Sequence, residues 1–106
     1  MAELPGSGLA ERLAEVADEI DGVEGRAAGD EVEYVLHGVV FSVVGIDRAE
    51  FRLKPDIADA ALRTPDVQRS SRGAGWVELA PRSIDAFAVD RAESWFESAA
   101  RLAASH

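Results

Sequence analysis

The spacing of apolar residues changes near residue 23, and this change limits the fold more than any other feature. Between residues 7 and 20 an apolar residue recurs every three or four positions. This spacing predicts an amphipathic helix whose buried stripe holds Leu9, Leu13, Val16 and Ile20. Over residues 31–36 and 49–54 apolar and polar residues alternate, as in strands with one buried face, and the run VVFSVV between them is apolar enough for a central strand. The gaps between these strands are shorter than the crossover of about a dozen residues that parallel neighbours need, so we expect antiparallel pairing.

We expect strands over residues 31–36, 39–44 and 49–54, an edge strand over 23–27, and two short strands over 67–71 and 76–79. A short helix begins at Pro55 and ends before Pro65, because a residue that precedes proline avoids helical geometry. In the last helix, Asp90 is predicted as the N-cap, with Glu93 at the matching capping-box position. This order indicates an α+β fold: an antiparallel sheet of about five to six strands with N- and C-terminal helices and one short central helix packed on it.

The chain has 106 residues, which is enough for one hydrophobic core. We expect a flexible lead over residues 1–6, a single α+β domain over 7–104 and a flexible tail over 105–106. No stretch approaches the roughly 20 apolar residues that span a bilayer. The first residues also lack the basic start and apolar run of a signal peptide. The expectation is a cytoplasmic protein without a membrane partner, present as a monomer or as a weak dimer through a sheet edge.

Charge is unevenly distributed along the chain, whose net charge is −9. Residues 1–47 hold 11 acidic and 2 basic residues, whereas residues 48–82 hold 5 acidic and 7 basic ones. Duplex nucleic acid is normally bound by a basic face that neutralises several phosphates. The overall charge therefore disfavours nucleic acid, although the middle third retains enough positive charge for a local basic patch.

Few residues are suited to catalysis or metal binding. Cysteine is absent, which excludes disulfides, thiolate zinc sites and cysteine nucleophiles. The two histidines are His37, expected on the polar face of a strand, and His106 at the end of the sequence. No serine lies in a GxSxG motif, and no DxDxDG calcium loop occurs. We therefore expect a protein that is not an enzyme and that has no metal or cofactor.

The segment RSSRGAGWVEL, residues 69–79, combines cations, hydroxyls and two glycines. It lacks the lysine and the following helix of a Walker loop, and its glycines do not complete GxGxxG. A turn between two strands is the favoured interpretation. The alternative is an arginine cluster for carboxylate or phosphate, and the candidate contacts for a ligand or nucleic acid are Arg52, Lys54, Arg63, Arg69, Arg72 and Trp76.

The position of Trp76 has two interpretations. It packs under a helix, or it stands on the open face of the sheet beside arginines. We favour the core position, because large aromatic residues in small domains usually anchor packing. Trp95 lies on the apolar stripe of the last helix and is expected in the core as well.

From residue 40 to the last helix, the sequence resembles the MmcQ/YjbR-like family. The matching features are VVFSVV, FRLKPD, the Gly75-Trp76-Val77 segment, and Ser94-Trp95-Phe96 in the closing helix. The resemblance implies a double-wing α+β fold related to the TfoX N-terminal domain. That fold is often described as DNA-binding-like, and the family supplies no catalytic residues to assign.

Two functional hypotheses follow. The first is a non-catalytic interaction or regulatory module that binds an unknown protein or a small anionic ligand through its basic middle segment. The alternative is a DNA-binding-like protein that uses the same segment, which the resemblance suggests and the acidic composition disfavours.

Overall fold

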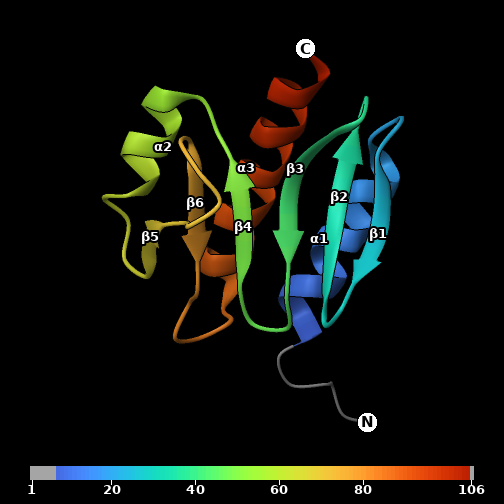
Figure 1. The fold of residues 1–106 in the computed structure, drawn as a ribbon. Helices are drawn as coiled ribbons and strands as arrows, with labels where there is room; N and C mark the ends of the chain where they lie inside the picture. The colour runs from blue at the N-terminus through green and yellow to red at the C-terminus, as the bar shows by residue number, and fades with distance from the viewer. Residues whose placement is uncertain (1–6, 106) are drawn as a thin grey trace, which may run out of the picture.

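The computed structural model describes residues 7–105 (Figure 1). The predicted lead over residues 1–6 and the last residue of the predicted tail lie outside the described residues. The elements within the described part follow the expected order. They are α1 (Ser7–Glu19), β1 (Glu24–Ala28), β2 (Glu31–Leu36), β3 (Val39–Val44), β4 (Ala49–Arg52), α2 (Pro55–Ala61), β5 (Val67–Arg69), β6 (Trp76–Leu79) and α3 (Ala86–Ala104).

The strands form one six-stranded sheet in the order β1-β2-β3-β4-β6-β5, and all neighbouring pairs are antiparallel. The predicted α+β class and the predicted antiparallel pairing are therefore confirmed. Both long helices lie behind the sheet in Figure 1, with α1 behind the β1–β2 side and α3 behind the centre, while α2 stands beside β6. One face of the sheet is thus covered by helices. We call the other face the open face.

The edge strand expected over 23–27 is present as β1, whereas β4 and β5 are shorter than the strands expected over 49–54 and 67–71. Between β2 and β3 the register shifts, because Tyr34 lies opposite Ser42 while Val35 lies opposite Val40. Phe41 is therefore the extra residue of a β-bulge. Both Phe41 and Ser42 are fully buried, and the Ser42 hydroxyl donates a hydrogen bond to the carbonyl oxygen of Glu50 at 2.8 Å.

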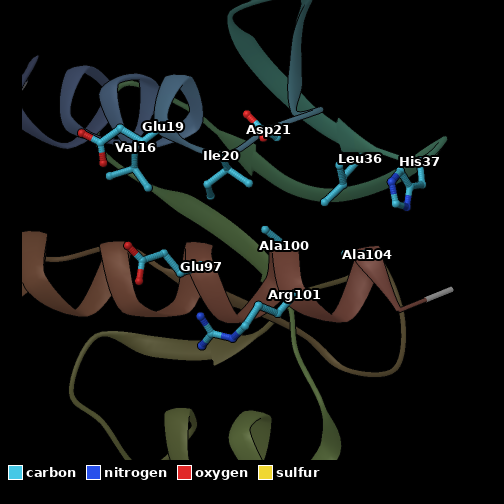
Figure 2. A pocket seen from close by; sticks show the side chains of 10 residues that line it. All are labelled: Val16, Glu19, Ile20, Asp21, Leu36, His37, Glu97, Ala100, Arg101 and Ala104. Atoms are coloured by element: carbon cyan, nitrogen blue, oxygen red, sulfur yellow. The ribbon is translucent and has the colours of Figure 1, made fainter.

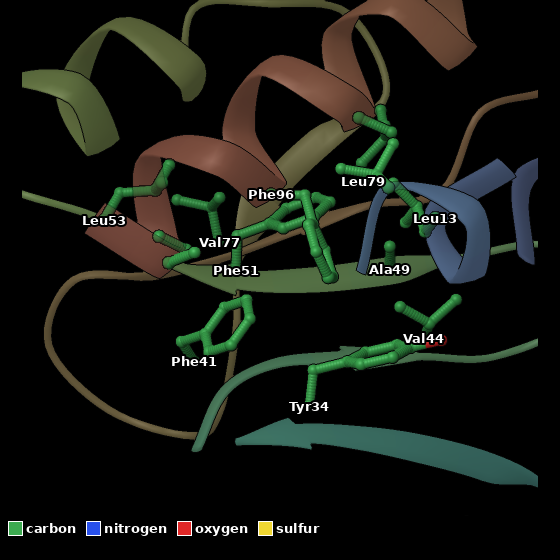
Figure 3. Close-up of a cluster of buried hydrophobic side chains, with 14 of the residues drawn as sticks. Leu13, Tyr34, Phe41, Val44, Ala49, Phe51, Leu53, Val77, Leu79 and Phe96 are labelled. Carbon is green, nitrogen blue, oxygen red and sulfur yellow. The ribbon is translucent and has the colours of Figure 1, made fainter. Parts of the chain in front are cut away.

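The core lies between the helices and the sheet, and Phe96 of α3 is at its centre (Figure 3). The ring of Phe96 meets the rings of Tyr34 and Phe41 edge-on, each at a centroid distance of 5.1 Å. Trp95 on the same helix is partly buried and makes an edge contact with Phe51, with 6.2 Å between centroids. From α1, Leu9, Leu13 and Val16 are buried as the helical spacing predicts.

The predicted start of the last helix is wrong. The helix begins at Ala86, and Asp85 is its N-cap, because the Asp85 side chain accepts a hydrogen bond from the Ala88 amide at 2.9 Å. Glu93 does not act in a capping box. Its carboxylate accepts from Arg12 of α1, with 2.5 Å between Arg12 Nε and Glu93 Oε2, and this hydrogen bond raises the pKa of Arg12.

The predicted position of His37 is also wrong. β2 ends at Leu36, and His37 with Gly38 forms the two-residue connection to β3. Both residues have positive φ, at 53° and 78°. A two-residue hairpin favours a turn with positive φ at both central positions, because its twist then matches that of the strands. His37 therefore lies in the turn and is not one of the paired residues of β2 and β3.

No helix within residues 7–105 combines the length and the apolar character needed to cross a bilayer.

Phe96→Ala should lower the free energy of unfolding by about 3–5 kcal/mol, because it removes a fully buried ring and leaves a cavity beside Tyr34 and Phe41. Phe87→Ala is the matched control, since Phe87 lies on the same helix but is 73% exposed. Urea unfolding followed by tryptophan fluorescence measures both variants. Equal losses in the two variants would contradict the central role of Phe96.

Candidate functional site: the open face and the glycine loop

The open face of the sheet carries charged residues from three strands. Strand alternation places Glu78 between the buried residues Val77 and Leu79, so its side chain is on the face opposite the helices. Glu50 lies directly opposite Glu78 in the β4–β6 register. Two carboxylates in such positions repel each other unless a cation lies between them.

Two arginines supply that positive charge. Arg48 reaches Glu78 at 2.7 Å, Glu31 at 2.6 Å and Glu50 at 3.6 Å. Arg72 pairs with Glu50 through its Nε, and its Nη2 lies 3.8 Å from Glu31 Oε1. We call this set the open-face network; its members are Glu31, Glu50, Glu78, Arg48 and Arg72.

The network is partly shielded from water, and this strengthens its interactions. The side chains of Glu50 and Glu78 are only 10% and 14% exposed. The pKa of Glu78 is lowered, first by the hydrogen bond from Gln68 at 3.0 Å and then by the one from Arg48. The pKa of Arg48 is raised, mainly by its hydrogen bond to Glu78.

The favoured core position of Trp76 is wrong. Trp76 is only partly buried, and it lies in register with Arg52 rather than under a long helix. The guanidinium carbon of Arg72 is 5.7 Å from the centre of its ring, which is a cation–π geometry. Because Val77 and Leu79 point into the core, alternation turns Trp76 toward the open face.

The structure separates the six predicted contact residues into three groups. Arg72 is held by the open-face network and by Trp76, as described above. Arg63 is exposed just beyond α2. We call the connection between β5 and β6, residues 70–75, the glycine loop. Two adjoining hollows lie beside it, and they are bordered by the remaining cations, Arg52, Lys54 and Arg69.

The first hollow has a volume of about 260 Å³ and is lined by Arg52, Leu53, Lys54, Pro55, Ala74, Gly75 and Leu102. The second, about 210 Å³, shares Pro55, Ala74 and Gly75 with it and adds Arg69, Trp76 and Asp59 among its lining residues. Arg63 lines neither hollow. The lining of the first hollow thus contains two cationic residues and no acidic one, whereas the lining of the second contains both Arg69 and Asp59.

Gly75 holds the glycine loop against the end of β4. Its carbonyl oxygen accepts a hydrogen bond from the Leu53 amide at 2.9 Å, and its φ is +83°. A Cβ at this position would lie 2.9 Å from the Leu53 carbonyl oxygen, which is closer than side chains tolerate. The glycine is therefore needed for this close approach. The favoured interpretation of RSSRGAGWVEL, a turn between two strands, is confirmed, and the loop also lines both hollows through Ala74 and Gly75.

Sequence patterns did not identify Arg48, although it pairs with three carboxylates of the open face. Its partners come from β2, β4 and β6, and the position of β6 beside β4 cannot be read from local spacing. Within the described residues, no group of three or more histidine, cysteine, aspartate or glutamate side chains has the arrangement of a metal site.

Arg48→Met should lower the free energy of unfolding at pH 7 by about 1–2 kcal/mol, because Glu50 and Glu78 would then face each other without their shared cation. The loss of stability should be no larger than this, because the Arg48 side chain is 43% exposed and water weakens its ion pairs. Arg82→Met is the matched control. Its ion pair with Asp66 is at the surface, where Arg82 is 91% exposed, so its removal should have almost no effect.

The effect of Arg48→Met should depend on pH. The folded-state pKa of Glu78 lies below its ordinary value of 4.5, so its stabilisation is present above pH 4.5 and is lost as pH falls through the folded-state pKa. Protonation of Glu78 also removes its repulsion with Glu50, which destabilises the variant at higher pH. Chemical unfolding at a series of pH values should show the difference between wild type and variant shrinking below pH 4.5; a constant difference would contradict the electrostatic role.

Comparison with known proteins identifies the fold but no family. No protein-family model matches the sequence, and no curated protein matches it either. A crystal structure of a protein from Pseudomonas syringae, determined by the Northeast Structural Genomics Consortium, is similar, with a TM-score of 0.65. The match covers 88% of this chain and 97% of that chain at 8% sequence identity. At this identity the similarity establishes a shared architecture and nothing about activity.

Proposed function

We propose that this protein is a non-catalytic binding module that holds the anionic group of a small ligand or of a partner protein in the first hollow. The observation that carries the proposal is the lining of that hollow, in which the exposed cation Lys54 lies beside Arg52 and the backbone of Gly75. Arg69 borders the adjoining hollow, which shares Gly75 with the first. Lys54 is exposed, so a ligand in solution can reach its side chain.

The size and charge of the surface favour a compact anion over duplex DNA. A hollow of about 260 Å³ lies just below the usual range of small-molecule sites, roughly 300–1,000 Å³, and suits a carboxylate or phosphate group. A duplex would need a broad basic face. The open face instead contains three carboxylates, which outnumber the two arginines that bridge them.

We also propose that the chain is a distant member of the MmcQ/YjbR-like family with its double-wing fold. The motifs quoted above support this assignment, as does an antiparallel sheet flanked by terminal helices. A cytoplasmic location and a monomeric or weakly dimeric state remain predictions.

Titration with orthophosphate, followed by amide chemical shifts, tests the binding proposal. We expect shifts at residues 52–54 and 74–75, and binding that weakens as salt is added, because the interaction is charge-based. Lys54→Met should weaken binding by about fivefold, as loss of one exposed ion pair would.

Arg63→Met is the matched control, since Arg63 is an exposed cation that lines neither hollow, and its affinity should equal that of wild type. Equal losses in the two variants would reduce the effect to general charge attraction and contradict the site. A duplex oligonucleotide is titrated in parallel. Steeply salt-dependent binding of the duplex would favour the DNA-binding alternative instead.

A further inference from the structure

A larger groove lies on the opposite side of α3 from the two hollows. Its volume is about 510 Å³, and it is formed by the C-terminal halves of α1 and α3 together with the end of β2. Figure 2 shows Ile20 above Ala100 in the middle of the groove, with Leu36 of β2 to their right, beside His37. Val16 and Ala104 complete the apolar part of its lining.

The charged residues at the rim of the groove are mostly acidic. Glu19, Asp21 and Glu97 contribute carboxylates, and Arg101 is the one arginine or lysine in the lining. The Arg101 guanidinium donates a hydrogen bond to the Ser98 hydroxyl at 3.2 Å. His37 lies at the other end of the groove from Glu19 and Glu97 in Figure 2.

The C-terminal end of α1 adds to this negative field. The C-terminus of an α-helix carries a partial negative charge, and a basic residue in the last turn normally compensates it. The last turn of α1 contains no basic residue, and Glu19 is its final residue. The C-terminal turn of α3 also borders the groove through Ala104, but it contains Arg101, so the uncompensated helix end is that of α1. A cation bound here would therefore interact favourably with side-chain and backbone charges together.

From these features we propose that the groove binds a small hydrophobic cation, with its hydrocarbon part on Ile20, Leu36 and Ala100 and its ammonium group near Glu19 and Glu97. The apolar floor favours a ligand with hydrocarbon surface over a hydrated metal ion, because burying that surface supplies the binding energy. The volume matches that of a small-molecule site. This site is separate from the anion site proposed above and does not depend on it.

Octylammonium is a suitable probe for the intact protein, observed through amide chemical shifts. We expect saturable shifts at residues 20, 36–37 and 100–104, and an affinity at least about tenfold higher than that of octanoate. Octanoate has a similar chain with the opposite charge, so it tests the electrostatic part. Ethylammonium keeps the charge with little chain, and it should cause far weaker shifts because it buries little apolar surface.

Variants locate the site. Glu97→Gln should weaken octylammonium binding by about two- to fivefold, because it removes one rim charge and keeps the side-chain shape. Glu11→Gln makes the same change at an exposed position of α1 that does not line the groove, and it should leave binding unchanged. Ala104→Leu adds bulk at an exposed lining position and should reduce binding without unfolding the protein.

Three outcomes would overturn the proposal. They are the absence of saturable shifts, equal binding of octanoate and octylammonium, and equal effects of the Glu97 and Glu11 variants. Shifts at residues 52–54 and 74–75 instead would place the probe at the glycine loop and would also count against it. The orthophosphate and octylammonium experiments report on different residues, so each proposal can fail alone.

Discussion

The burial of Phe96 between α3 and the centre of the sheet is the contact on which the architecture depends. Its ring touches aromatic residues of β2 and β3, while α3 also packs against β4 and α1. One helix thereby joins parts of the chain that are far apart in sequence. In a domain of this size, the apolar surface that a single layer can bury is limited, so removal of the ring would affect the sheet and both long helices together.

The two faces of the sheet are stabilised by different interactions. The helix-covered face is apolar, and its stability comes from area removed from water. The open face is covered by ion pairs in which Arg48 and Arg72 cross three strands. These pairs offset the electrostatic repulsion among the acidic residues of β2, β4 and β6. The arginines on this face therefore neutralise charge that the acidic strands bring together. Lys54 and Arg69, which lie beside the glycine loop, are not members of this network.

Local patterns predicted the features that depend on local spacing. The stripe of Leu9, Leu13 and Val16 follows from helical geometry, and antiparallel pairing follows from short connections. The N-cap was misassigned because Asp85 and Asp90 are chemically equal candidates, and only the packing of α3 on α1 draws Glu93 toward Arg12. The side of Trp76 could not be determined before the burial of Val77 was known.

The candidate site shows the same division between local and long-range information. The sequence indicated a cationic middle segment, but Arg72 is drawn to Glu50 by a register between strands that are distant in the chain. Arg63 is separated from the hollows because α2 ends before it. The strand order determines which cations lie beside carboxylates. The apolar periodicity of the sequence does not contain that order.

The strand order also bears on how the chain assembles. β5 precedes β6 in the sequence but lies outside it, so residues 67–79 form a hairpin that can be complete before it joins β4. Until this hairpin docks, β4 is an unpaired edge with free backbone donors and acceptors, and such an edge is a template for association between chains. Slow docking of the hairpin would therefore leave newly made chains open to intermolecular β-pairing. Once the hairpin has docked, the hydrogen bond between Leu53 and Gly75 extends the contact just beyond the end of β4.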